Sequence, residues 1–144
     1  MRTTKTRLIL WGTLLAWLLA CPAVWAGEMV VVANSSVPVD SLHRATVADI
    51  YLGNKTRWDN GDAIHVVMLK GGATHERFAQ DTVGTTPVKL KNYWKKVVFT
   101  GTGTPPKIVR SEGDMVKAVA NTSGAIGYVD SSTAHGDVKV IGIR

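Results

Sequence analysis

Cysteine is nearly absent from this chain of 144 residues, which holds only Cys21, together with four histidines. A single thiol cannot build a disulfide framework within the chain, and it cannot supply a cysteine-rich zinc site. No two histidines have the helical spacing of a metal-binding pair, and no carboxylate completes such a set. We therefore expect no metal and no cofactor, and we expect the fold to depend on its apolar core.

Sequence patterns of catalytic sites are missing as well. There is no G-x-S-x-G elbow, and no ordered set of serine, histidine and aspartate can be identified. Asp49 and Asp59 flank a turn, but neither lies in a motif that would make them an acid and base pair. We predict that the protein is not an enzyme.

Long hydrophobic runs are confined to the N-terminus. A basic segment precedes the apolar residues 8–19, and residues 24–26 end in alanine at the usual cleavage spacing. This is the pattern of a secretory signal peptide, so we predict that residues 1–26 are removed and that the protein is periplasmic. A lipoprotein cleavage site before Cys21 is the alternative. The leucine in front of its alanine fits that pattern poorly, and we favour cleavage after Ala26.

Acidic side chains are fewer than basic ones, 11 against 17. Without residues 1–26 the chain keeps 14 basic and 11 acidic residues, a net charge of +3. Nucleic-acid-binding proteins concentrate more positive charge on one face, so we expect no nucleic-acid partner and only a weak attraction for anions. About 118 residues suffice for one core but not for two, which predicts a single domain over residues 27–144.

Residues 27–144 alternate between β-branched runs and amphipathic segments. The runs predict strands and the amphipathic segments predict helices, in the order β-α-β-α-α-α-β-β. This order is typical of an α/β layer structure, with a small mixed sheet flanked by helices on both faces. Predicted strands cover residues 29–33, 63–69, 125–129 and 138–143; predicted helices cover residues 44–52 and 74–82, begin at Thr86, and run from Ser111 to Asn121.

Short motifs predict where these helices begin and end. Gly53 follows the first helix and can take the left-handed conformation at its end. Thr74 and Ser111 are placed to cap helix N-termini, and Thr86 combines a cap residue with a proline at the first helical position. Ser111 has an aspartate three residues later, in the manner of a capping box.

The helix that begins at Thr86 has two contrasting faces. Its apolar stripe predicts a core-facing side, and we expect Trp94 on it, like Trp58, to belong to the core rather than to a ligand site. Lysines fill the other side between residues 89 and 96. A docking surface for an acidic partner is one interpretation of them, but we favour an ordinary solvated face. His75 belongs to a different helix, the one predicted over residues 74–82, and we expect it to have a structural role. The stripe comprises Leu90, Tyr93, Trp94, Val97 and Val98.

Four blocks of the sequence, in order, resemble the periplasmic phosphate-binding proteins of bacterial transporters. The resemblance covers nearly all of residues 27–144 and is to one lobe of that two-lobed family. It implies a single lobe of a type-2 periplasmic-binding-protein-like fold. The blocks are VVVAN at residue 30, DIYLGNKTRW at residue 49, VVMLKGGATHERF at residue 66, and GTGTPP at residue 101 with GAIGYV at residue 124.

In that family, two lobes close around a dehydrated oxyanion, and one set of contacts comes from a loop at a helix N-terminus with an arginine and a Ser-Gly-Thr run. The arginine position falls near Met68 or Leu69, which cannot pair with phosphate, so Lys70 would stand in as a point charge. Backbone N–H groups at a helix start still attract anions. The resemblance therefore implies a weak oxyanion site, with the Ser-Gly-Thr positions on Gly72, Ala73 and Thr74. Thr102 and Gly103 could line the same cleft, but the alternative, a rigid surface loop over residues 100–106, is the interpretation we favour for them.

Two functions remain open at this point. The first is an exported solute-binding module, related to ABC transporter proteins, that binds phosphate or another small oxyanion. The second is a periplasmic interaction or adaptor module for a membrane transporter or sensor protein, in which solute binding has been lost. An exposed basic cleft at Gly72 would favour the first, and an exposed apolar patch would favour the second. A homodimer could rebuild a two-lobed cleft, so the oligomeric state is open as well.

Overall fold

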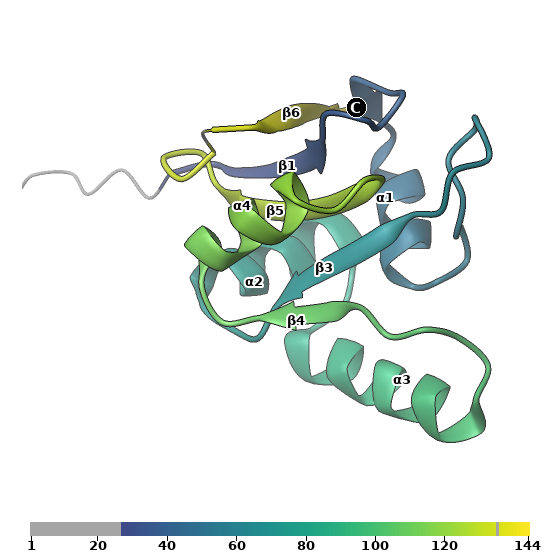
Figure 1. Ribbon diagram of the computed structural model, residues 1–144. Coiled ribbons are helices and arrows are strands. Elements are labelled where there is room, and N and C mark those ends of the chain that lie inside the picture. Colours follow the sequence, from purple (N-terminus) through teal and green to yellow (C-terminus); the bar gives the residue numbers. More distant parts are fainter. Residues whose placement is uncertain (1–26, 135) are drawn as a thin grey trace, which may run out of the picture.

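A six-stranded mixed sheet in the order β2-β6-β1-β5-β3-β4 forms the middle of the molecule (Figure 1). The computed structural model describes residues 27–134 and 136–144, so the predictions about the signal peptide and Cys21 lie outside the described residues. The strands are β1 (Met29–Asn34), β2 (Ser41–Leu42), β3 (His65–Leu69), β4 (Lys107–Val109), β5 (Ala125–Asp130) and β6 (Val138–Ile143).

The first strand lies in the interior of this sheet. β1 pairs antiparallel with β5 and with β6, whereas β3 pairs in parallel with β5 and with β4. Successive residues of a strand point to opposite faces, and Val31, Val32 and Ala33 are all buried. Both faces of β1 are therefore covered. The prediction of a mixed sheet with a doubly buried first strand is confirmed.

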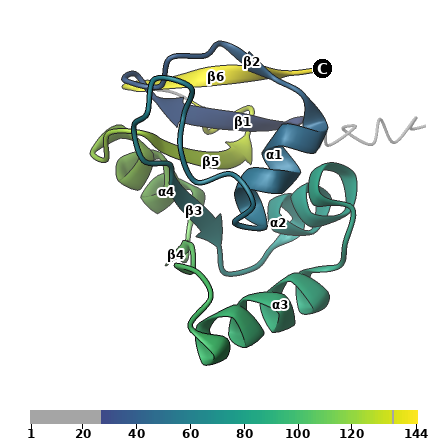
Figure 2. The ribbon, with the colours of Figure 1, turned by 90° about the vertical axis from the view of Figure 1, so that its right-hand side faces the viewer.

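Helices cover both faces of the sheet, as the sequence predicts. α4 (Glu112–Ala120) packs on one face, and α1 (Arg44–Tyr51) and α2 (Ala73–Arg77) lie on the other (Figure 1). α2 continues into η1 (Phe78–Val83), a π-helical segment that packs against α1. α3 (Pro87–Thr100) stands apart from the sheet beyond β4 (Figures 1 and 2). Within the described residues, no helix combines the length and the apolar character needed to span a bilayer.

Three buried aromatic rings join the sheet to the helices on the α1 side. Phe78 stacks on Tyr128 with ring centroids 3.8 Å apart, and Tyr51 meets both rings edge-on. The Tyr51 hydroxyl donates to the Val67 carbonyl at 3.0 Å, so its burial leaves no unpaired polar group. These rings tie α1, η1 and β5 into one core.

The two tryptophans predicted to be core residues are buried, which confirms that prediction. The Trp58 indole N–H donates to the Gly124 carbonyl at 3.0 Å, and the Trp94 indole N–H donates to the Tyr51 carbonyl at 3.1 Å. Each ring combines apolar burial with a satisfied donor. Since Tyr51 is the last residue of α1, Trp94 attaches α3 to the body of the protein.

Three of the predicted helix boundaries are confirmed. Gly53 follows α1 with a φ of +77°, a left-handed conformation that glycine adopts without strain. The Thr86 hydroxyl accepts the Lys89 N–H at 3.2 Å at the start of α3. The Ser111 hydroxyl accepts the N–H of Asp114 at 3.1 Å at the start of α4.

The predicted helix over residues 74–82 differs most from the structure. Thr74 does not cap it, because the cap position is Gly72 and Thr74 lies inside α2. The Thr74 hydroxyl donates instead to the Glu112 carboxylate on α4, which forms a stronger, charge-assisted hydrogen bond. From Phe78 onward the backbone is π-helical rather than α-helical.

Two short strands, β2 and β4, are absent from the predicted order. Their lengths of two and three residues are too short to show an alternating pattern. The apolar stripe of α3 is also only partly correct. Leu90 and Trp94 are buried, but Tyr93 is 38 % exposed and Val98 is 54 % exposed. α3 lies beyond the edge of the sheet (Figure 2), and the body of the protein buries only Leu90 and Trp94 of this helix.

Candidate functional site

The turn that joins β3 to α2 carries four of the six predicted site residues. Lys70, Gly72 and Ala73 are exposed, and Thr74 is half-buried. The Lys70 N–H donates to the Val109 carbonyl at 2.9 Å, so the backbone of the turn is anchored to β4 while the Lys70 residue is exposed. Gly72 has a φ of +100°, and no atom lies within 4 Å of the position that a Cβ would take. The backbone of this turn is therefore open to solvent.

Backbone donors are the main resource of this turn for binding an anion. The first N–H groups of a helix have no partner within the helix, so those that follow Gly72 point outward from the start of α2. α2 is only five residues long before it passes into η1, which limits the helix dipole. Binding there would depend on the individual N–H groups and on Lys70 rather than on a strong field.

The Thr74 hydroxyl already has an anionic partner. It donates to Glu112 Oε1 at 2.5 Å, and the Thr133 hydroxyl donates to Glu112 Oε2 at 2.8 Å. Glu112 is the first residue of α4, so its carboxylate bridges α4, α2 and the turn after β5. The Glu112 carboxylate therefore accepts the same kind of hydroxyl hydrogen bond that a bound oxyanion would accept. The one hydroxyl retained from the Ser-Gly-Thr positions is thus engaged within the protein.

Charges around the turn are of both signs. Lys70 and Arg110, the residues that follow the paired Leu69 and Val109, contribute positive charges, whereas Glu76 lies in the first turn of α2 and the Glu112 carboxylate lies against Thr74. Like charges near a bound anion weaken its binding. The surface at Gly72 is therefore open, but it is not the basic cleft that would favour solute binding.

A buried pair of polar side chains supports the turn from beneath. The Leu69 N–H donates to the Tyr128 hydroxyl at 3.0 Å, and that hydroxyl lies 2.6 Å from Nδ1 of His75. Burial lowers the pKa of His75, with the Glu76 carboxylate opposing this in part, and burial raises the pKa of Tyr128 well above its usual value. Both side chains are neutral at pH 7. The structural role predicted for His75 is confirmed, since it holds the end of β3 against α2.

Thr102 and Gly103 lie at the opposite end of β3 from the turn. β4 runs parallel to β3, with Lys107 beside Val67 and Val109 beside Leu69. The loop before β4 therefore sits near the start of β3, while the turn at Gly72 follows the end of β3. The structure does not bring the six predicted residues into one site, because a parallel strand pair separates the two loops by its whole length.

The loop at Thr102 instead lines a groove of about 690 Å³ that has both polar and apolar walls. The other wall of this groove is the turn after α1, with Lys55 and Arg57. Lys55 forms an ion pair with Asp59 at 3.0 Å, and Arg57 donates to a backbone carbonyl at 2.8 Å. Sequence reasoning missed this groove. The available signal was that the resembling block at residues 49–58 precedes β3 and the block at residues 101–106 precedes β4. The starts of two parallel strands lie at the same end of the pair.

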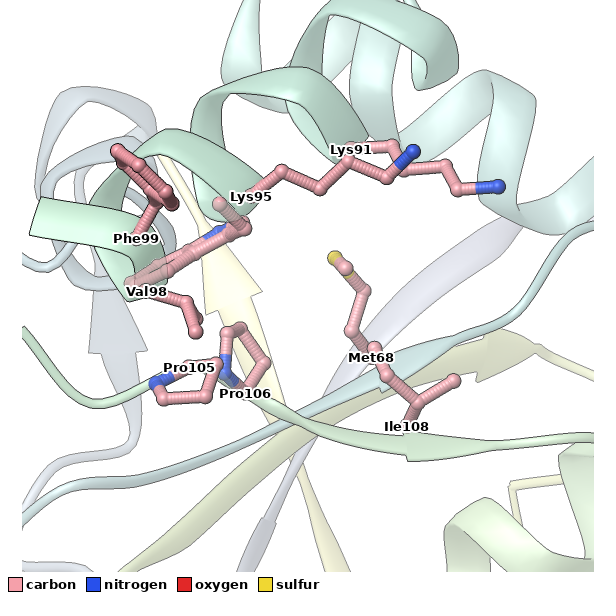
Figure 3. Close-up of a pocket in the computed structure, with 9 residues that line it drawn as sticks. Met68, Lys91, Lys95, Val98, Phe99, Pro105, Pro106 and Ile108 are labelled. Atoms are coloured by element: carbon pink, nitrogen blue, oxygen red, sulfur yellow. The ribbon is translucent and has the colours of Figure 1, made fainter.

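A second groove, which is apolar, lies between α3 and β4 (Figure 3). Sequence reasoning missed it too, because it assigned the apolar residues of α3 to the core. Two lysines and seven apolar residues line the groove: Met68, Lys91, Trp94, Lys95, Val98, Phe99, Pro105, Pro106 and Ile108. Among the residues the structure describes, no group of three metal-ligating side chains comes together.

Comparison with known proteins identifies the fold. No protein-family model matches the sequence, and no curated protein matches it significantly. Solved structures do match. A phosphate transport receptor of the ABC type from Vibrio cholerae has 19% sequence identity and a TM-score of 0.61, over 81% of this chain and 46% of that one.

Two further solved structures agree with this result. A protein described as a phosphate ABC transporter substrate-binding protein, with bound phosphate, from Clostridium perfringens has 24% identity and a TM-score of 0.63, over 81% of this chain and 45% of that one. PstS from Borrelia burgdorferi has 11% identity and a TM-score of 0.61, over 82% and 47%. The chain thus spans less than half the length of the proteins it matches. The predicted fold, one lobe of the periplasmic-binding-protein type, is confirmed.

Proposed function

We propose that the protein is an exported module of the solute-binding type that recognises a small oxyanion weakly at the turn of Lys70, Gly72, Ala73 and Thr74. In this proposal residues 1–26 are a signal peptide, residues 27–144 form the binding domain, and the protein works in the periplasm without catalysing a reaction. The observation that carries the proposal is the open backbone at Gly72, where α2 begins. The phosphate bound to the Clostridium perfringens protein of the same fold supports phosphate as the ligand to test.

The expected affinity is low. Lys70 offers a single mobile charge instead of a bidentate arginine, and Glu112 competes for the Thr74 hydroxyl. A few charge-assisted hydrogen bonds on an open surface leave about −4 to −5.5 kcal/mol, a dissociation constant of roughly 0.1 mM to 1 mM. Binding should weaken with salt, because an exposed charge is screened. Thr102 and Gly103 are not part of this proposal, because they lie at the other end of β3.

Titration with phosphate, followed by amide shifts in nuclear magnetic resonance, tests the proposal. Shifts should be confined to residues 70–75 and the start of α4. Substitution of Gly72 would be a poor control, since its φ of +100° strains any side chain. Glu112→Gln is sharper. It removes the charge beside Thr74 and should tighten phosphate binding by about fivefold, equivalent to about 1 kcal/mol for a like charge in water.

The matched control for Glu112→Gln is Asp114→Asn. Asp114 is exposed on the same turn of α4, so its substitution removes the same charge without touching Thr74. Phosphate affinity should change little in this variant. Absence of amide shifts at about 10 mM phosphate, in both the wild type and Glu112→Gln, would overturn oxyanion recognition at this turn.

A second function, an interaction or adaptor module, is favoured by a specific observation. Glu112 supplies from within the protein the contact that a bound oxyanion would make to Thr74. Exposed apolar residues gather elsewhere, on α3 and β4. In this reading a membrane transporter or sensor protein would be bound through that apolar surface, and loss of the phosphate response would leave the interaction intact.

A further inference from the structure

Positive charge is concentrated in one segment of the chain. Residues 82–111, which run from the end of η1 through α3 and β4 to the residue before α4, contain six basic residues and no acidic one. The rest of residues 27–144 contains eight basic and eleven acidic residues. The modest net charge therefore conceals a strongly basic region beside a mildly acidic remainder. A basic region of this kind attracts anionic groups.

The apolar groove of about 460 Å³ lies within this basic region (Figure 3). Its deepest residues are Met68 of β3 and Trp94 of α3, which are buried. Its walls are unusually exposed for large apolar side chains: Phe99 is 92 % exposed, Val98 is 54 % exposed and Ile108 is 49 % exposed. Gathered apolar side chains that face water are typical of a surface that a partner covers.

The position of α3 explains why the groove is open. The Trp94 indole and the Tyr93 hydroxyl attach the helix to the end of α1, through hydrogen bonds to Tyr51 and Leu52. The face of α3 that carries Trp94 also faces β4 across the groove, and β4 is the last strand of the sheet, with β3 as its one neighbour. The two elements are thus held at a distance by contacts made elsewhere, and their facing side chains do not close on one another.

Two lysines form the rim of the groove. Lys91 and Lys95 are one helical turn apart, and in Figure 3 their side chains extend in the same direction from α3. Like charges at this spacing destabilise a helix slightly. The ion pairs among the described residues are Lys55–Asp59 and Lys139–Asp40, and neither involves α3. An acidic group placed over the rim would therefore meet two cations that have no carboxylate partner in the described part of the chain.

We propose that the groove between α3 and β4 is a docking site for a segment of a partner protein that presents apolar side chains next to acidic ones. This inference rests on the second function above, the interaction module, and it names the chemistry of the partner. Charge complementarity with Lys91 and Lys95 selects an acidic segment, and the exposed Phe99, Val98 and Ile108 select an apolar one.

Binding of a synthetic peptide tests this proposal. The probe is a short peptide of leucine, phenylalanine and glutamate, compared with the same peptide in which glutamine replaces glutamate. The exported protein should bind the acidic peptide, with amide shifts along α3 and β4, and should bind the glutamine peptide more weakly. Phosphate should not move these signals, so failure of docking and failure of oxyanion binding are read from different residues.

Two charge-reversed variants provide the decisive comparison. Lys91→Glu with Lys95→Glu should weaken binding of the acidic peptide by at least about tenfold, since like charges then face each other. Lys89→Glu with Lys96→Glu, a matched pair on the same helix that does not line the groove, should weaken it far less. All four lysines are exposed, so both variants should keep the thermal stability of the wild type.

Four results would overturn the proposal. The first is an equal loss of peptide binding in the two variants, and the second is that the peptide shifts amide signals outside α3 and β4. The third is that the protein binds neither peptide, and the fourth is that a different occupant covers the groove. Concentration-dependent dimerisation that Phe99→Ser abolishes would identify a second copy of this chain as that occupant. Binding to anionic lipid vesicles that Phe99→Ser abolishes would identify a membrane.

Discussion

The turn at Gly72 follows the end of β3, and the groove lies between α3 and the neighbouring edge strand β4. These two regions differ in how far their own polar and apolar groups are paired or covered within the protein. Beneath the turn, Tyr128 and His75 are hydrogen-bonded and buried, and the Thr74 hydroxyl is held by Glu112. In the groove, large apolar side chains face water and the rim lysines have no ion pair in the described part of the chain.

This difference bears directly on binding. A group that is already paired must give up its partner before it can bind a ligand, whereas an exposed apolar surface gains free energy when it is covered. Sequence resemblance points to the turn, but unsatisfied groups remain mainly in the groove. The likeness of a motif to a binding loop therefore does not by itself measure the binding capacity of that loop.

Removal of Trp94 should give the largest effect and should break the comparison from the side of the groove. The ring is 7 % exposed, and its N–H donates to Tyr51, so Trp94→Ala leaves a cavity where α3 is attached. The free energy of unfolding should fall by about 3–5 kcal/mol. Denaturant unfolding would measure this. Phe99→Ala on the same helix is the control and should cost less than about 0.5 kcal/mol, since Phe99 is exposed.

Tyr128→Phe should have the next largest effect and should break the comparison from the side of the turn. The variant removes the hydroxyl that accepts the Leu69 N–H and contacts His75, and leaves a buried donor unpaired. The expected loss is about 1–3 kcal/mol of unfolding free energy. Tyr93→Phe is the control, because its hydroxyl donates to a carbonyl at an exposed position. Equal losses in the two variants would show that the hydrogen bonds beneath the turn stabilise the protein no more than a hydrogen bond at an exposed position.

The elements of the fold could be predicted where a local signal determines them. β-branched runs identified the strand at Val31, and cap residues identified helix starts at Thr86 and Ser111. The contacts of the candidate site could not be predicted in this way. Glu112 reaches Thr74 across 38 positions of the chain, and no local pattern records that contact. The exposed side of α3 was missed because an apolar stripe in the sequence does not determine how many of its residues the rest of the protein covers.

The pH dependence of stability should give the smallest effect and should sharpen the description of the turn. Burial lowers the folded-state pKa of His75 below about 6.5, its value in the unfolded chain. Between those two pKa values the unfolded state binds more protons than the folded state, so stability falls as pH falls through this window and is fully present above it. The slope cannot exceed about 1.4 kcal/mol per pH unit for one group.

Urea unfolding from about pH 7.5 to pH 5 should show this loss in the wild type and in His65→Gln, whose histidine is exposed, but not in His75→Gln. Identical profiles in all three proteins would mean that His75 accepts a proton as readily in the folded protein as in water, and that the buried neutral pair does not support the turn.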